Sequence, residues 1–79
     1  MSKRTVRNLT LTKPGGVKVQ QQFVATETGG GYSTIVGATR LPGERWDYLP
    51  TIEIDEPFAD WISRWASYSV ANGFTVVAR

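Results

Sequence analysis

The hydrophobic period of this chain changes once, near Asp55, and this change constrains the fold more than any other feature. Before Asp55, apolar and polar residues alternate in stretches separated by turns that contain glycine and proline, a pattern typical of antiparallel strands. After it, apolar residues recur every three or four positions as far as residue 71, as in an amphipathic helix. A β-branched stretch after Gly73 indicates one more strand. The predicted order is therefore β-β-β-β-α-β.

Four strands are predicted before the helix. They cover residues 4–12, 17–26, 32–40 and, at the end of the stretch 46–54, a short fourth strand over 51–54. The connections between them contain the glycines and prolines that favour chain reversal. Short connections of this kind predict an antiparallel sheet. Gly37, inside the third strand, is expected to mark a bulge.

The second strand alternates most clearly between two faces. Residues on one face of a strand are two positions apart, so this strand has an apolar face and a polar face. We expect the apolar residues of the first face to point at the helix and the second face to turn outward, where water or nucleic acid could cover it. The first face carries Val17, Val19, Gln21, Phe23 and Ala25, and the second carries Lys18, Gln20, Gln22, Val24 and Thr26.

The helix is predicted over residues 56–71. Asp55 is expected to be its N-cap, and Pro57 and Asp60 suit the first turn, where a missing N–H costs nothing and an acidic side chain is favourable. Asn72–Gly73 predicts a left-handed C-cap.

These elements predict an α+β fold. A helix that crosses back over one face of the sheet gives a two-layer sandwich, with one helix on a mainly antiparallel sheet of four to five strands. The length of 79 residues predicts a single domain, 1–79. If the last strand, residues 74–78, runs parallel to 51–54, the crossover should be right-handed.

The chain contains no His and no Cys, which removes several kinds of site. Disulfides, Cys/His zinc sites and Ser–His or Cys–His nucleophiles are excluded. Carboxylates occur in pairs, Glu53 with Asp55 and Glu56 with Asp60, and could serve acid–base or metal chemistry. A strand end followed by a helix N-terminus also explains them. We therefore predict a protein that is not an enzyme and holds no cofactor and no metal.

The charge is unevenly distributed along the chain. The net charge is +2, but residues 1–41 carry six basic residues and one acidic residue, and residues 42–79 carry three and six. This asymmetry predicts either a basic face for nucleic acid or an acidic protein, or attraction between the two halves within the fold. No apolar stretch follows the basic residues 1–4 and no apolar run approaches 18 residues, so we expect a cytoplasmic protein without a membrane span.

Trp61, Arg64 and Tyr68 lie along one edge of the helix's apolar arc, at i, i+3 and i+7. Trp, Tyr and Arg are enriched among the residues that dominate binding energies. They could bind a partner or a second copy of the chain. The alternative is that both aromatic side chains only flank a small core.

The best-supported function at this level is that of a non-enzymatic binding protein. Small proteins of phages and mobile elements, anti-CRISPR proteins among them, often bind a host protein or nucleoprotein complex and block it sterically, and by that class analogy we expect an inhibitor of this kind. The expected contact surface is Trp61, Arg64 and Tyr68, or the basic loop around Lys13 and Lys18.

The alternative function is binding of single-stranded nucleic acid by a basic sheet face. Cations on the strands would neutralise phosphates, and Tyr32 or Trp46 would stack on bases. The cations concerned are Lys3, Arg4, Arg7, Lys13, Lys18 and Arg40.

The segment Ile52–Ile62 runs from a strand through a cap into a helix, after about four strands. This arrangement resembles the single-stranded-DNA-binding transcriptional coactivators and their bacterial and phage relatives. The resemblance implies a twisted antiparallel sheet that contacts DNA through Lys13, Lys18 and Arg40, and a helix that mediates dimerisation. The predicted strand after Gly73 is a departure from that pattern.

Overall fold

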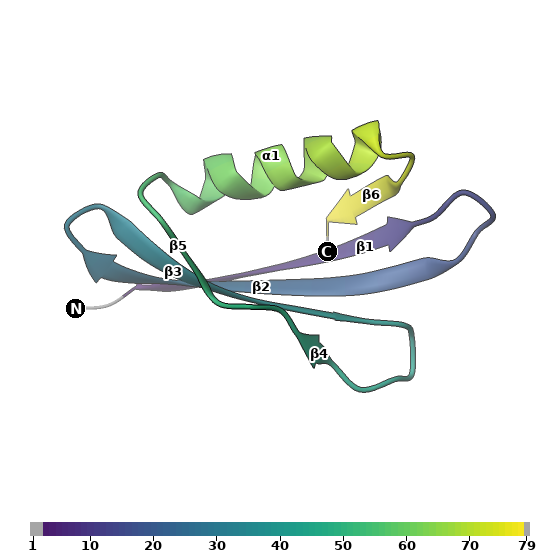
Figure 1. The fold of residues 1–79 in the computed structure, drawn as a ribbon, viewed down its shortest axis with the longest axis horizontal. Helices are drawn as coiled ribbons and strands as arrows, with labels where there is room; N and C mark the ends of the chain where they lie inside the picture. The colour runs from purple at the N-terminus through teal and green to yellow at the C-terminus, as the bar shows by residue number, and fades with distance from the viewer. Residues whose placement is uncertain (1–2, 79) are drawn as a thin grey trace.

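The computed structural model describes residues 3–78, without the side chains of Thr28 and Gly29. Figure 1 shows a twisted sheet with one helix lying along one of its faces, which confirms the predicted α+β sandwich. The elements in chain order are β1 (Arg4–Thr12), β2 (Lys18–Gly29), β3 (Tyr32–Arg40), β4 (Asp47–Tyr48), β5 (Ile52–Ile54), α1 (Phe58–Ala71) and β6 (Thr75–Ala78).

The sheet has the strand order β4-β3-β2-β1-β6, and every neighbouring pair is antiparallel. β5 also pairs with β3, along the same outer edge as β4. β5 matches the short fourth strand predicted over 51–54, and β4 is an additional short strand before it. Pro50, between the two, has no N–H to donate to a ladder, although the N–H of Leu49 still donates to the carbonyl of Gly37 at 2.9 Å. α1 then carries the chain across the sheet to β6, which runs in the same direction as β5.

The core lies between α1 and the face of the sheet formed by the odd-numbered residues of β1, β2 and β3. Its buried side chains are Leu9, Leu11, Phe23, Ala25 and Ile35, and α1 packs Ile62 and Trp65 against them. The predicted inner face of the second strand is therefore confirmed at Phe23 and Ala25. Val17 does not follow it: the residue precedes β2 and is 51% exposed, because the turn from β1 to β2 projects beyond the core.

Gly37 does not mark a bulge. It pairs directly with Phe23 in a regular register, and the irregularity between β2 and β3 lies at Glu27 and Gly29 instead. A Cβ on Gly37 would approach Phe23 Cε1 to 2.9 Å. Gly37 therefore makes room for a packed aromatic ring.

The helix begins later than predicted. Pro57 is the N-cap residue, no side chain caps the first turn, and Asp55 lies in the bend before it. The predicted N-cap at Asp55 is therefore wrong, and the reason is local: the residue before a proline is forced out of the helical region, so the helix cannot include Glu56. Asp60 does lie in the first turn, as expected.

The helix ends as predicted. Gly73 adopts a φ of 92°, its N–H donates to Val70 O at 3.0 Å, and the N–H of Phe74 donates to Ser69 O at 3.0 Å. These two bonds form a Schellman motif, which satisfies carbonyls that the end of a helix leaves without partners. Within residues 3–78, no helix combines the length and the apolar character that crossing a membrane requires.

Candidate binding surfaces

Four aromatic side chains follow one edge of α1, and we name Phe58, Trp61, Trp65 and Tyr68 the aromatic edge. Consecutive ring centroids lie 6.2, 5.9 and 6.3 Å apart, and the two indoles are nearly parallel, at 8°. Separations of 4.5–7 Å are those of favourable aromatic pairs. The aromatic edge is therefore a continuous stack along one flank of the helix.

The sheet holds this stack in place. The ring of Phe23 contacts Trp61 and Trp65 edge to face, with centroids at 5.3 and 5.5 Å. The indole Nε1–H of Trp65 donates to Gln21 Oε1 at 2.9 Å. Because both indoles are fixed from below, their outer faces are presented without further loss of side-chain freedom.

An apolar groove of about 270 Å³ runs between the aromatic edge and the chain that joins β4 to β5. Its sheet side includes Leu49, Pro50 and Ile52, and its helix side includes Trp61 and Trp65. A shallower hollow on the outer side of the helix is lined by Trp61, Arg64, Trp65 and Tyr68. The two indoles separate these depressions, so we treat them as one surface, the groove surface.

The structure brings the predicted partner-binding residues together, with different surroundings. Trp61 is half-buried and packs against the core, whereas Tyr68 is 64% exposed. The guanidinium of Arg64 forms an ion pair with Glu56 rather than with Asp60. The residues that sequence reasoning did not assign to this surface are Trp65, Leu49, Pro50 and Ile52.

The opposite, open face of the sheet carries a polar hollow of about 390 Å³. There the guanidinium carbon of Arg40 lies 4.2 Å from the centroid of the Trp46 ring, and Arg40 Nε donates to Gln20 Oε1 at 2.7 Å. Beside them, Gln22 Nε2 donates to Asn8 Oδ1 at 3.3 Å. A cation on an indole face and a row of amides together offer hydrogen bonds and one stacking surface.

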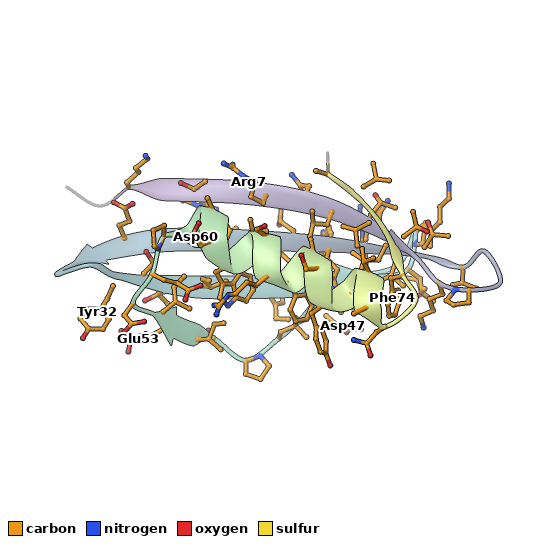
Figure 2. All side chains as sticks on the ribbon, turned by 90° about the horizontal axis from the view of Figure 1, so that it is seen from above. Arg7, Tyr32, Asp47, Glu53, Asp60 and Phe74 are labelled. Carbon is orange, nitrogen blue, oxygen red and sulfur yellow. The ribbon has the colours of Figure 1, made fainter. Side chains whose placement is uncertain are left out.

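The predicted nucleic-acid-binding residues are divided among three places. Lys18, Arg40 and Trp46 lie at one end of the open face, and Lys13 lies in the neighbouring turn. Arg7 is two residues before Leu9 on β1, so its side chain lies on the same face of the sheet, the face that α1 covers. Figure 2 shows Tyr32 near the opposite end of the molecule.

The acidic residues that the structure describes do not neutralise the described part of the basic half through close contacts. Among residues 3–78, the one ion pair within 4.0 Å joins Arg64 to Glu56, and both belong to the acidic half. Glu53 and Asp55 lie beside the start of α1, and no group of three His, Cys, Asp or Glu side chains in the described part of the chain could hold a metal ion.

No protein-family model, no curated protein and no solved structure matches this chain. Dimerisation through α1, which the likeness to the coactivators implies, stays a prediction.

Proposed function

We propose that this chain is a non-enzymatic protein-binding module that acts by covering the surface of a partner, with the groove surface as its contact region. The observation that carries the proposal is the pairing of an apolar groove with the Trp, Tyr and Arg residues beside it. Interfaces are dominated by a few residues of these types around a desolvated pocket.

The groove suits one apolar anchor side chain of the partner. Fully burying a Leu or Phe side chain contributes about 1.5–3 kcal/mol. Tyr68 and Arg64 lie at the outer margin, where Tyr68 adds apolar area together with a hydroxyl. A partner with an exposed Leu, Met or Phe beside polar groups fits this arrangement.

The proposal is tested by capture of partners from the organism that produces the chain. Tyr68→Ala combined with Ile52→Ala should abolish capture, because both exposed side chains border the groove surface. Val77→Ala is the matched control: Val77 is 55% exposed on β6, away from the groove surface, and the variant should retain the partner. Equal capture by both variants would contradict the proposal, provided that circular dichroism shows both to be folded.

A second function, binding of single-stranded nucleic acid, is favoured by the packing of Arg40 on Trp46 beside Gln20, with Lys18 nearby on the same face. Aromatic stacking contributes about 1–3 kcal/mol per base, and phosphate contacts weaken steeply between about 50 and 200 mM salt. Titration of oligonucleotides, followed by tryptophan fluorescence at both salt concentrations, tests it. Lys13→Glu with Lys18→Glu should then abolish binding, whereas binding unaffected by this change and by salt would contradict it.

A further inference from the structure

β6 covers only part of the outer edge of β1. Its pairs with β1 extend from Thr12, opposite Thr75, to Leu9, opposite Ala78. Within residues 3–78, no strand pairs with the outer side of Arg4–Asn8. Figure 2 shows this half of β1 as the outermost strand, beside the labelled Arg7. Among the described residues, the sheet therefore has an open edge at Arg4–Asn8.

The backbone groups on this edge point outward at alternate residues. The N–H of Glu27 donates to Lys3 O at 2.9 Å, and the N–H of Lys13 donates to Val17 O at 2.8 Å. Odd-numbered residues of β1 therefore bond to β2, and alternation within an antiparallel ladder turns the even-numbered ones to the other side. Arg4, Val6 and Asn8 consequently present their N–H and C=O groups to the open edge.

One of these outward carbonyls is held by a neighbouring side chain. Arg7 Nη1 donates to Val6 O at 3.0 Å, in an exposed contact between adjacent residues. Charged side chains often protect the edges of natural sheets in this way. An incoming strand can take over this bond with its own N–H, which releases the guanidinium for another partner.

The edge is positively charged. Lys3, Arg4 and Arg7 are all exposed, and none of them forms an ion pair with a described residue. Three cations on one short edge attract carboxylates and repel other cations. The chemistry of the edge therefore selects an acidic segment.

An apolar hollow of about 590 Å³ lies beside the edge on the helix face. Arg7, Leu9 and Val76 line it from the sheet, and Ile62, Ala66 and Val70 line it from the flank of α1 that faces away from the groove surface. A strand added next to β1 directs alternate side chains to this face. The hollow can therefore receive an apolar side chain of that strand.

We propose that the open edge of β1, residues Arg4–Asn8, binds an extended acidic segment of a partner protein as an additional strand, with an apolar side chain of that segment in the hollow beside Ile62. In strand addition of this kind, main-chain hydrogen bonds supply affinity and pockets for alternate side chains supply specificity. This site lies on the opposite flank of α1 from the groove surface and does not depend on the function proposed for that surface.

A second copy of the chain fits this edge poorly. A symmetric pairing of two β1 edges about Val6 brings the Arg4 and Arg7 side chains of both copies into one short interface, where like charges oppose association. In a head-to-tail pairing, the open edge of β1 would meet the opposite edge of the sheet in a second copy, where β4 and β5 lie one after the other along β3. A long edge of this kind would extend past the open edge of β1 and meet β6, which occupies the positions opposite Leu9–Thr12.

The test uses a fluorescein-labelled, capped peptide of sequence Glu-Leu-Glu-Val-Glu-Leu-Glu, which reads the same in both directions. Fluorescence polarisation at about 50 mM salt should show binding that is lost when Lys replaces every Glu of the peptide. Arg4→Glu with Arg7→Glu should weaken binding by about tenfold or more, because Arg4 faces the same side as the peptide's glutamates and becomes repulsive, and the reversal at Arg7 removes a further positive charge from the edge. The matched control, Lys13→Glu with Arg45→Glu, reverses the same number of positive charges at the other end of the molecule and should bind the peptide normally.

A backbone variant separates strand addition from simple charge attraction. Val6→Pro removes an N–H that faces outward and leaves the ladder between β1 and β2 intact, so it should abolish binding, whereas Val6→Ala should retain it. Circular dichroism verifies the fold of both. Should Val6→Pro not fold, amide exchange in the unaltered chain decides: the peptide must slow exchange at Val6 and Asn8.

Three results would overturn the proposal. They are the absence of any polarisation change up to about 1 mM protein, equal binding by the two charge-reversal variants, and amide protection that appears on α1 near Tyr68 instead of β1. Tyr68→Ala, which tests the groove surface, should leave peptide binding unchanged. The two proposals therefore fail independently.

Discussion

The ring of Phe23 occupies the space that any side chain at residue 37 would need. A Cβ on Gly37 would lie 2.9 Å from Phe23 Cε1 and 3.3 Å from Leu49 Cδ1. The ring cannot move aside, because it is almost fully buried and makes edge-to-face contacts with Trp61 and Trp65. The close approach of Phe23 to Gly37 therefore places β3 directly against the ring that supports the aromatic edge.

Gly37→Ala is therefore expected to destabilise the protein, although alanine normally suits a strand better than glycine. Overpacking of this kind costs about 1–3 kcal/mol, which urea unfolding followed by circular dichroism measures. In a Phe23→Leu background the same substitution should cost less, because the opposing ring is gone. An equal cost in both backgrounds would show that crowding by Phe23 is not the cause.

Gln21→Ala should lower the free energy of unfolding by about 1–2 kcal/mol, because it leaves the Trp65 indole N–H without its partner. Gln22→Ala is the matched control on the open face, where the hydrogen bond from the Gln22 side chain to Asn8 is longer, at 3.3 Å. Its effect should be the smaller of the two in the same unfolding experiment. The reverse order would mean that the bond to Trp65 contributes little.

Substitutions at Gly73 should follow the cost of a left-handed backbone. Its φ is 92°, and a Cβ there would meet Pro14 Cγ at an ordinary 3.4 Å, so conformation rather than crowding determines the effect. Gly73→Ala should lower stability by about 1–2 kcal/mol and Gly73→Asn by less, since asparagine tolerates this region. Thermal unfolding of the two variants provides the ranking, and a more stable Ala variant would contradict it.

The ion pair between Glu56 and Arg64 should contribute little to stability. The Arg64 side chain is 68% exposed, and exposed pairs contribute about 0–1 kcal/mol. Glu56→Gln should therefore change the free energy of unfolding by no more than about 0.5 kcal/mol, and the difference should shrink further in about 0.5 M salt. A larger change that salt leaves intact would indicate a role for Glu56 beyond this pair.

The strands and the end of the helix could be predicted because their signals are local. Alternation placed Phe23 and Ala25 on the inner face, and Gly73 supplied the positive φ that a Schellman motif needs. The start of the helix was mispredicted because the acidic residue at 55 was weighed as a cap without the restriction that Pro57 places on the residue before it.

The groove surface could be predicted only in part. The spacing of Trp61, Arg64 and Tyr68 placed them on one flank of a helix. The sheet side of the groove depends instead on how β5 runs back along β3. Leu49, Pro50 and Ile52 carry no pattern that places them beside two indoles. Likewise, the open edge of β1 follows from the short reach of β6, which pairs with residues more than sixty positions earlier.

The pairing of β6 with β1 has a consequence for how the protein is made. Leu9 leaves the ribosome long before Ala78, its partner in the sheet. The edge of β1 therefore stays uncovered along its whole length until β6 has left the ribosome. Contacts this distant in sequence slow folding, so a nascent chain of this protein spends the interval with a pairing-competent strand exposed.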